Sequence, residues 1–153
     1  MPTYLNQVNI FMNRFELFKK KSIQLNMKLN HIKNVLGTEL QCCSTEPITG
    51  FFRDGYCKTN SSDQGSHVVA SIISNEFLIF SKSMGNDLSS PNPLYNFPGL
   101  KKGDRWCVCA IRWKQAYDAG YAPFVVLEAT HEKALEFIEL SALIEKSHDK
   151  YLT

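Results

Sequence analysis

The sequence lacks the segments that place a protein in or across a membrane. It has no apolar run near the roughly 20 residues that a transmembrane helix requires, and no apolar stretch typical of a secretory signal. It also has no glycine-rich phosphate loop, no nucleophile elbow, no His-Glu-x-x-His motif and no internal repeats. We therefore expect a cytoplasmic protein without a membrane span and without the best-known catalytic motifs.

The net positive charge of the chain comes from its first 26 residues. The chain of 153 residues has a formal net charge of +2, but residues 1–26 account for +3, which leaves −1 for the remainder. The basic stripe of a nucleic-acid-binding protein is therefore missing, and we expect no nucleic-acid partner. With 44% hydrophobic residues over its full length, the chain has the composition of a folded protein, and its length fits one domain.

Residues 1–26 differ from the rest of the chain. They contain phenylalanines at helical spacing followed by a run of lysines: Phe11, Phe15, Phe18 and Lys19–Lys21. One interpretation is a basic amphipathic arm that directs the protein to a membrane or an organelle. We favour a disordered extension or a start codon assigned too early, because Met27 can open a self-sufficient globular domain over 27–153.

Three apolar runs predict the strands of a central sheet. They are His67–Ile73, which is rich in β-branched residues, Arg105–Ile111 and Phe124–Ala129. Because helical patterns alternate with these runs, the sequence predicts an α+β fold with a mixed sheet covered by helices.

The helix signals follow the strands. Ser74 is a good N-cap and Gly85 a good terminator, so a helix is expected between them. Further helices are expected over Trp113–Tyr117 and Ala142–Ser147. The stretch Leu135–Leu140 fits a helix or a strand, and we favour a short strand.

The segment Asn86–Lys102 is broken by three prolines. A connection of this length without secondary structure is typical of a functional loop. We expect Tyr95 and Phe97 to pin it to the domain, which would give an ordered loop. The alternative is an exposed apolar surface, which would make the protein a non-catalytic protein-interaction module.

The five cysteines form an odd set, and we expect free thiols in a reducing compartment. Weak candidates for a thiol-ligated metal site are Cys43, Cys57, Cys107 and Cys109. Cys107 and Cys109 are closer in sequence than the paired ligands of structural zinc. Thiol catalysis with His67 or His131 as the base is a further alternative, and buried inert thiols are the simplest interpretation.

Polar residues gather at expected strand ends and tight turns, where loops commonly present functional groups. Since arginine suits the capture of carboxylate or phosphate, we expect a polar pocket for a small ligand or substrate, such as an anion. Its candidate residues are Cys43, Arg53, Asp54, His67, Asp104, Arg105, Cys107, Glu128 and His131. This hypothesis requires His67, Asp104 and His131 to approach one another. The competing interpretation is that these charges only fix their own loops, and the sequence identifies no cofactor and no oligomeric state.

Specific motifs connect the chain to a known family. They include Thr49-Gly-Phe-Phe-Arg-Asp-Gly55, Gly103-Asp-Arg-Trp-Cys-Val-Cys-Ala110 and Leu127-Glu-Ala-Thr-His131. These motifs resemble the bacterial and plant family catalogued as domain of unknown function 2237, over about Asn34 to Lys146. The resemblance implies a shared fold and brings no established activity. Family members begin near the position of Met27 and often carry a cysteine where this chain has Ala70.

Overall fold

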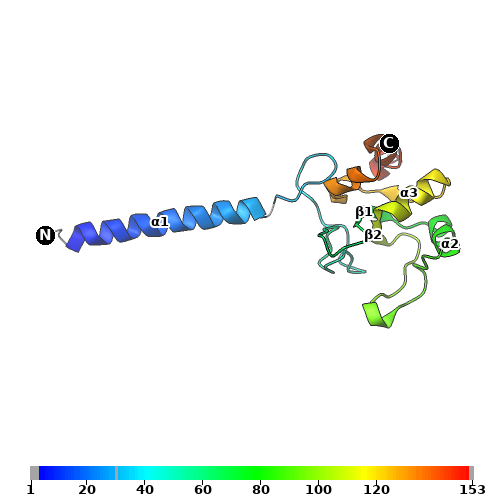
Figure 1. Cartoon of the computed structure of the whole chain (residues 1–153), viewed down its shortest axis with the longest axis horizontal. Helices are drawn as coiled ribbons and strands as arrows, with labels where there is room; N and C mark the ends of the chain where they lie inside the picture. Colours follow the sequence, from blue (N-terminus) through cyan, green and yellow to red (C-terminus); the bar gives the residue numbers. More distant parts are fainter. Residues whose placement is uncertain (1–3, 30, 152–153) are drawn as a thin grey trace. The chain divides into compact units, whose positions relative to one another are not determined.

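The computed structural model describes residues 4–29 and 31–151, which divide into two units between Ile32 and Lys33. The first unit contains α1 (Tyr4–Leu29), drawn in blue in Figure 1. Its side chains from residue 7 to residue 24 are exposed, including the three phenylalanines at helical spacing. The described part of this segment is helical, and the division into an N-terminal extension over 1–26 and a domain over 27–153 remains a prediction.

The second unit is built on a three-stranded sheet in the order β2-β1-β3. The central strand is β1 (His67–Ile72), flanked by β2 (Arg105–Cys109) and by the short β3 (Phe124–Val125). Figure 1 shows β1 and β2 next to each other, with α2 and α3 to the right of them. The predicted α+β class is confirmed.

Both ladders of the sheet are antiparallel, whereas a mixed sheet was expected. The β1–β2 ladder is antiparallel because the connection after β1 brings the chain back to the C-terminal end of β1. Ile73 donates its amide to the Asp104 carbonyl and Gly103 donates to the Ile73 carbonyl, so β2 starts where β1 ends. The one parallel pairing among the described residues is an isolated bridge between Val125 and Ser147.

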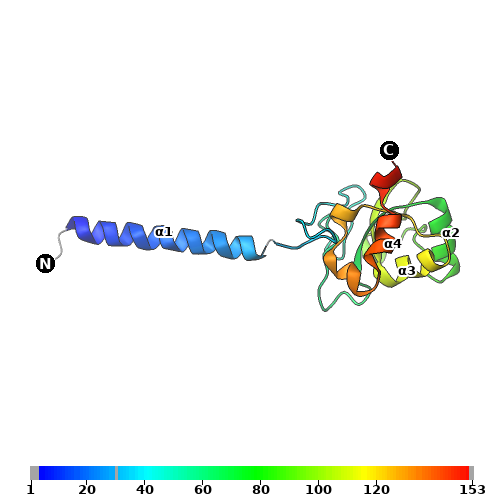
Figure 2. The ribbon, with the colours of Figure 1, turned by 90° about the horizontal axis from the view of Figure 1, so that it is seen from above.

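The helices cover this sheet and bury their apolar faces. In α2 (Asn75–Ser83) the predicted N-cap is present, because the Ser74 hydroxyl accepts the Phe77 amide, and Phe77 is fully buried. Helix α3 (Ala110–Asp118) follows β2 directly and buries Trp113. Figure 2 shows α3 beside α4 (Leu140–Glu145), to which it is joined by a hydrogen bond from the Tyr117 hydroxyl to the Glu145 carboxylate.

The chain after β3 forms short turns instead of the expected strand over Leu135–Leu140. Two 3-10 helices, η2 (Leu127–Ala129) and η3 (Glu132–Glu136), lead into α4, and η4 (His148–Tyr151) follows it. The strand prediction was wrong because the His131 side chain caps the turn that starts at Glu132. Among the described residues, no helix combines the length and the apolar character needed to span a bilayer.

The proline-containing loop is ordered by its own hydrogen bonds and by one aromatic contact. Asn92 and Phe97 exchange backbone hydrogen bonds around η1 (Pro93–Tyr95). The Phe97 ring packs 5.2 Å from the Trp106 ring, as expected for a residue that pins the loop. Tyr95 does not pin it, because 71% of this residue is exposed.

The segment 31–66 contains isolated bridges but no helix and no strand of the sheet. Buried Asn34 is one of its anchors. The side-chain amide of Asn34 donates to Thr38 Oγ1 at 2.8 Å and to the Glu128 carbonyl at 3.0 Å, and its Oδ1 accepts the Leu36 amide. One polar side chain thereby ties the start of the segment to the region after β3.

Replacing this anchor should be costly. We expect Asn34→Ala to lower the free energy of unfolding by roughly 2–3 kcal/mol, because several buried groups lose their partners. Denaturant unfolding of the full chain measures this. The control is Asn60→Ala, whose side chain caps an exposed turn at Ser62 and whose loss should cost less than about 1 kcal/mol. Equal costs for the two variants would contradict the anchor role.

Candidate functional site

A disulfide joins Cys57 to Cys107 and is the first correction to the sequence interpretation. The Cα atoms of the two residues are 5.3 Å apart, although 50 positions separate them in sequence. The expectation of free thiols is therefore wrong for these two cysteines. It holds for Cys42, Cys43 and Cys109.

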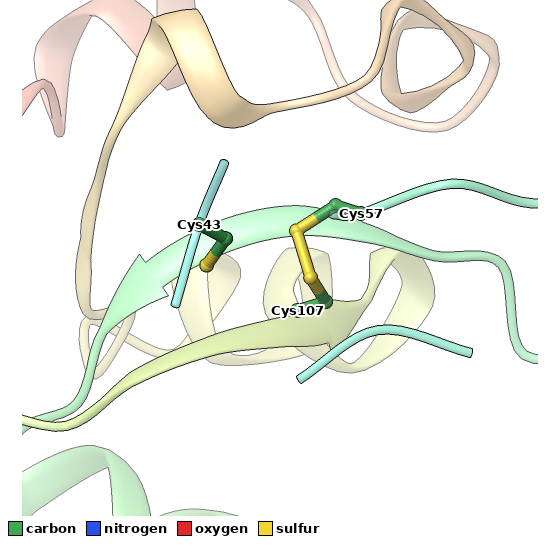
Figure 3. A group of neighbouring side chains, drawn as sticks. All are labelled: Cys43, Cys57 and Cys107. Atoms are coloured by element: carbon green, nitrogen blue, oxygen red, sulfur yellow. A yellow bond between two sulfur atoms is a disulfide. The ribbon is translucent and has the colours of Figure 1, made fainter. Parts of the chain in front are cut away.

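A third sulfur lies beside this disulfide. Figure 3 shows the Cys43 side chain next to the bonded pair, and the three Sγ atoms all lie within 4.8 Å of one another. The cluster is buried together with Ala70 and Ala129. Burial raises the pKa of the Cys43 thiol to about 12, against the opposing effect of the Arg105 charge, so Cys43 is a protonated thiol at neutral pH.

A cleft of about 530 Å³ borders the same disulfide, with Cys107 as one of its lining residues. Its walls carry aromatic side chains from the turn after Thr49, from the proline-containing loop and from β2: Phe51, Tyr95, Phe97 and Trp106. Two basic side chains, Arg53 and His67, line it as well. The cleft thus combines apolar walls with a small number of polar groups, as ligand sites do.

Arg53 is held in the cleft by its own tight turn. The residue has a φ of 52°, its amide donates to the Gly50 carbonyl, and its guanidinium donates to the same oxygen at 2.7 Å. The guanidinium carbon lies 4.9 Å from the centre of the Trp106 ring. Burial lowers the pKa of Arg53, and its Nε is a buried donor for which the described residues provide no acceptor.

His67 is oriented by a buried acid that the sequence interpretation missed. Asp63 Oδ1 lies 2.6 Å from His67 Nδ1, and Asp63 also accepts hydrogen bonds from the His67 amide and the Thr59 hydroxyl. Burial raises the pKa of Asp63, but these hydrogen bonds and the His67 charge lower it by more, so the carboxylate stays ionised. The pairing engages the Nδ1 atom of His67 and fixes the orientation of the ring. Asp63 belongs to a polar loop that looked like a connection only.

The expected meeting of His67, Asp104 and His131 does not occur, because Asp104 lies away from His67, although the His131 amide donates to the carbonyl of Val68, the neighbour of His67, at 3.0 Å. His67 pairs with Cys109 at one end of the β1–β2 ladder, while Asp104 adjoins the other end. The Asp104 carboxylate accepts the Lys101 amide at 3.0 Å. His131 Nδ1 accepts the Lys133 amide at 3.0 Å, so each of these two side chains caps its own turn.

The other candidate residues also fall into two groups, those that lie at the cleft and those that hold their own loops. Asp54 caps its loop at Tyr56 and pairs with Lys58 at 2.9 Å, and the Glu128 carbonyl holds Asn34. The exposed Arg105 lies close enough to Cys43 to act on its thiol. Of the nine candidates, Arg53, His67 and Cys107 line the cleft, and Cys43 lies beside Cys107. Cys109 is outside the three-sulfur cluster and lines a small cavity with His67.

Comparison with protein-family models identifies a match. A family model described as "Uncharacterized protein conserved in bacteria (DUF2237)" matches residues 33–147. The match covers the sheet, the cleft and the three-sulfur cluster. No curated protein matches the chain.

Removing the disulfide should destabilise the second unit. The bond closes a loop of about 50 residues, and the chain-entropy argument gives about 4 kcal/mol for a loop of this length. We therefore expect the Cys57→Ser variant to unfold at a markedly lower denaturant midpoint than the wild-type chain. The control is Cys42→Ser, which removes an exposed free thiol and should unfold like the wild type. Indistinguishable midpoints for the two variants would contradict the structural role of the bond.

Stability should also depend on the protonation of His131. Burial lowers the pKa of His131 below its ordinary value of 6.5, and its Nδ1 must be unprotonated to accept the Lys133 amide. The unfolded chain therefore binds the proton more readily than the folded chain, so stability is full above pH 6.5 and falls as the pH drops below it.

The measurement is denaturant unfolding at pH 7 and pH 5. We expect His131→Asn, which keeps a capping side chain, to lose less stability over this interval than the wild type. The control is His31→Asn, since His31 is exposed. A wild-type pH dependence that survives in His131→Asn would show that another group is responsible.

Proposed function

The chain belongs to the DUF2237 family of uncharacterized proteins conserved in bacteria, and we propose that its second unit binds a small organic anion in the cleft. The observation that carries the proposal is the unpaired, buried Nε of Arg53 beside the Trp106 ring. A desolvated guanidinium with a free donor favours a carboxylate or phosphate oxygen, because the charge strengthens the hydrogen bond.

The dimensions and walls of the cleft support an organic ligand. A volume of about 530 Å³ lies in the range of small-molecule sites. Aromatic side chains on facing segments, Phe51 and Tyr95 among them, favour a ligand with a flat apolar part. His67, fixed by Asp63, adds a second polar group that can contact the ligand through Nε2.

Asp87 narrows the choice of anion. Its carboxylate lines the cleft and is kept ionised by hydrogen bonds from Ser90 and Ser89, which lower its pKa. Lys82 lies 3.7 Å from this exposed carboxylate and offsets part of its charge, and the charge that remains disfavours a ligand with more than one negative charge. The proposed ligand is therefore a monoanion, such as an aromatic or branched monocarboxylate, and not a polyphosphate.

A protein-interaction role is the second candidate function, and the tip of the proline-containing loop favours it. Leu94 is 90% exposed and Tyr95 is 71% exposed. Tyr95 also lines the cleft, so its exposure is accounted for by a ligand site as well. We favour ligand binding over protein interaction, because a bound anion also accounts for the unpaired Arg53 donor.

The test is a thermal-shift and calorimetric screen of the full chain against monocarboxylates, with inorganic phosphate and a nucleoside triphosphate for comparison. We expect a monocarboxylate to bind, and Arg53→Gln to weaken it by about tenfold or more, because a charged hydrogen bond is lost. The control is Arg112→Gln, since Arg112 bonds to Met84 on another surface. Binding that is unchanged in Arg53→Gln, or no binding by any anion, would contradict the proposal and favour the interaction role.

A further inference from the structure

We propose that reduction of the Cys57–Cys107 disulfide converts the three-sulfur cluster into a binding site for a thiophilic cation, with Cu(I) as the best match. The cluster is Cys43, Cys57 and Cys107. This site shares Cys107 with the wall of the cleft proposed for the anion, but neither proposal depends on the other.

The positions of the three sulfurs suit one metal ion. A metal–sulfur distance of about 2.3 Å places the corners of a trigonal site about 4.0 Å apart. The Cys43 Sγ already lies within 4.8 Å of both bonded sulfurs, so the trigonal spacing is reached once the bond opens and the Cys57 and Cys107 side chains rotate apart. The spacing of the cysteines in sequence gave no sign of this, because the ligands come from three separate segments.

Hydrogen bonds other than the disulfide keep the ligands in place. The Cys43 amide donates to the Gly55 carbonyl at 2.8 Å, and the Cys107 amide donates to Thr49 Oγ1 at 2.9 Å. The Gly55 amide donates in turn to the Thr49 carbonyl at 2.9 Å. The backbones that carry Cys43 and Cys107 thus remain connected through residues 49–55 when the sulfur–sulfur bond opens.

The donor set selects the type of cation. It consists of sulfur alone within apolar surroundings that include Ala70, Ala129 and Val126. In the part of the chain that the structure describes, no imidazole or carboxylate joins the three sulfurs. Thiolate donors favour Cu(I) and zinc over magnesium and calcium. Zinc in structural sites takes four ligands almost without exception, so three sulfurs suit Cu(I) better.

The surroundings provide access and a compensating charge. Cys107 lines the cleft, so a cation can approach from that side. Three thiolates with one Cu(I) carry a net charge of −2, which apolar surroundings disfavour. The positive charge of Arg105 acts on Cys43 and offsets part of it.

The conversion is balanced in electrons and protons. A dithiol reductant gives two electrons and two protons to the disulfide and becomes a disulfide itself, which leaves Cys57 and Cys107 as thiols. Each of the three thiols then releases its proton to water as its sulfur binds the cation.

The test titrates Cu(I), and separately Zn(II), into the full chain under anaerobic conditions against a chromophoric competitor. A water-soluble phosphine replaces the dithiol and takes up an oxygen atom from water as it opens the disulfide. We expect the reduced chain to bind one Cu(I), more tightly than Zn(II), and the oxidised chain to bind neither. Cu(I) should also raise the Tm of the reduced chain. Because the comparison is between the reduced chain with and without Cu(I), it detects binding even if reduction itself lowers stability.

Cys43→Ser is the decisive variant, because it leaves the disulfide partners in place. It should weaken Cu(I) binding by at least about tenfold and remove the rise in Tm, since a direct ligand is lost. The matched control, Cys42→Ser, removes the neighbouring exposed thiol and should bind like the wild type. Equal Cu(I) binding by Cys43→Ser and wild type, equal binding by the oxidised chain, or no binding by the reduced chain would overturn the proposal. Zn(II) held as tightly as Cu(I) would overturn the three-coordinate assignment.

Discussion

The disulfide between Cys57 and Cys107 is the constraint on which the second unit most depends. It fastens the turn-rich segment 31–66, which contributes no strand to the sheet, to the middle of β2. The cleft is formed across this connection, because Arg53 belongs to the segment and Trp106 belongs to β2. Without the bond, the position of one wall relative to the other would rest on a few hydrogen bonds, and the entropy of a loop of about 50 residues would oppose it.

Buried titratable side chains differ in their charge state according to their hydrogen-bond partners. The Cys43 thiol and the His131 imidazole are both kept neutral, because desolvation disfavours the charged form of each. Asp63 is also buried, yet hydrogen bonds from His67 and Thr59 keep it ionised. Charge is thereby retained beside the cleft, where Asp63 orients His67, and is excluded from the sulfur cluster and from the turn after β3.

Local features of the fold were predictable from the sequence, and long-range pairings were not. The β-branched run correctly predicted β1, and Ser74 correctly predicted the start of α2. A strand signal and a helix N-cap both depend on residues that are close in sequence. The disulfide and the antiparallel ladder depend on how a long connection returns, which no local pattern reports. Arg53 and His67 were named as candidates from their places in a turn and at a strand start; both line the cleft, and their role in binding stays a prediction. Asp104 and His131 were misassigned because a side chain that caps a turn has the same local sequence context as one that faces a ligand.

The order of the sheet gives the segment 49–57 a protective role. Since β2 lies at the edge, its outward amides would be open to pairing with a strand of another molecule. The Thr49 hydroxyl occupies the Cys107 amide, and the covalent bond at the same residue holds the covering loop down. The loop that shapes the cleft therefore also covers part of the free edge of β2, at the place where an exposed edge strand would otherwise offer its amides to another molecule.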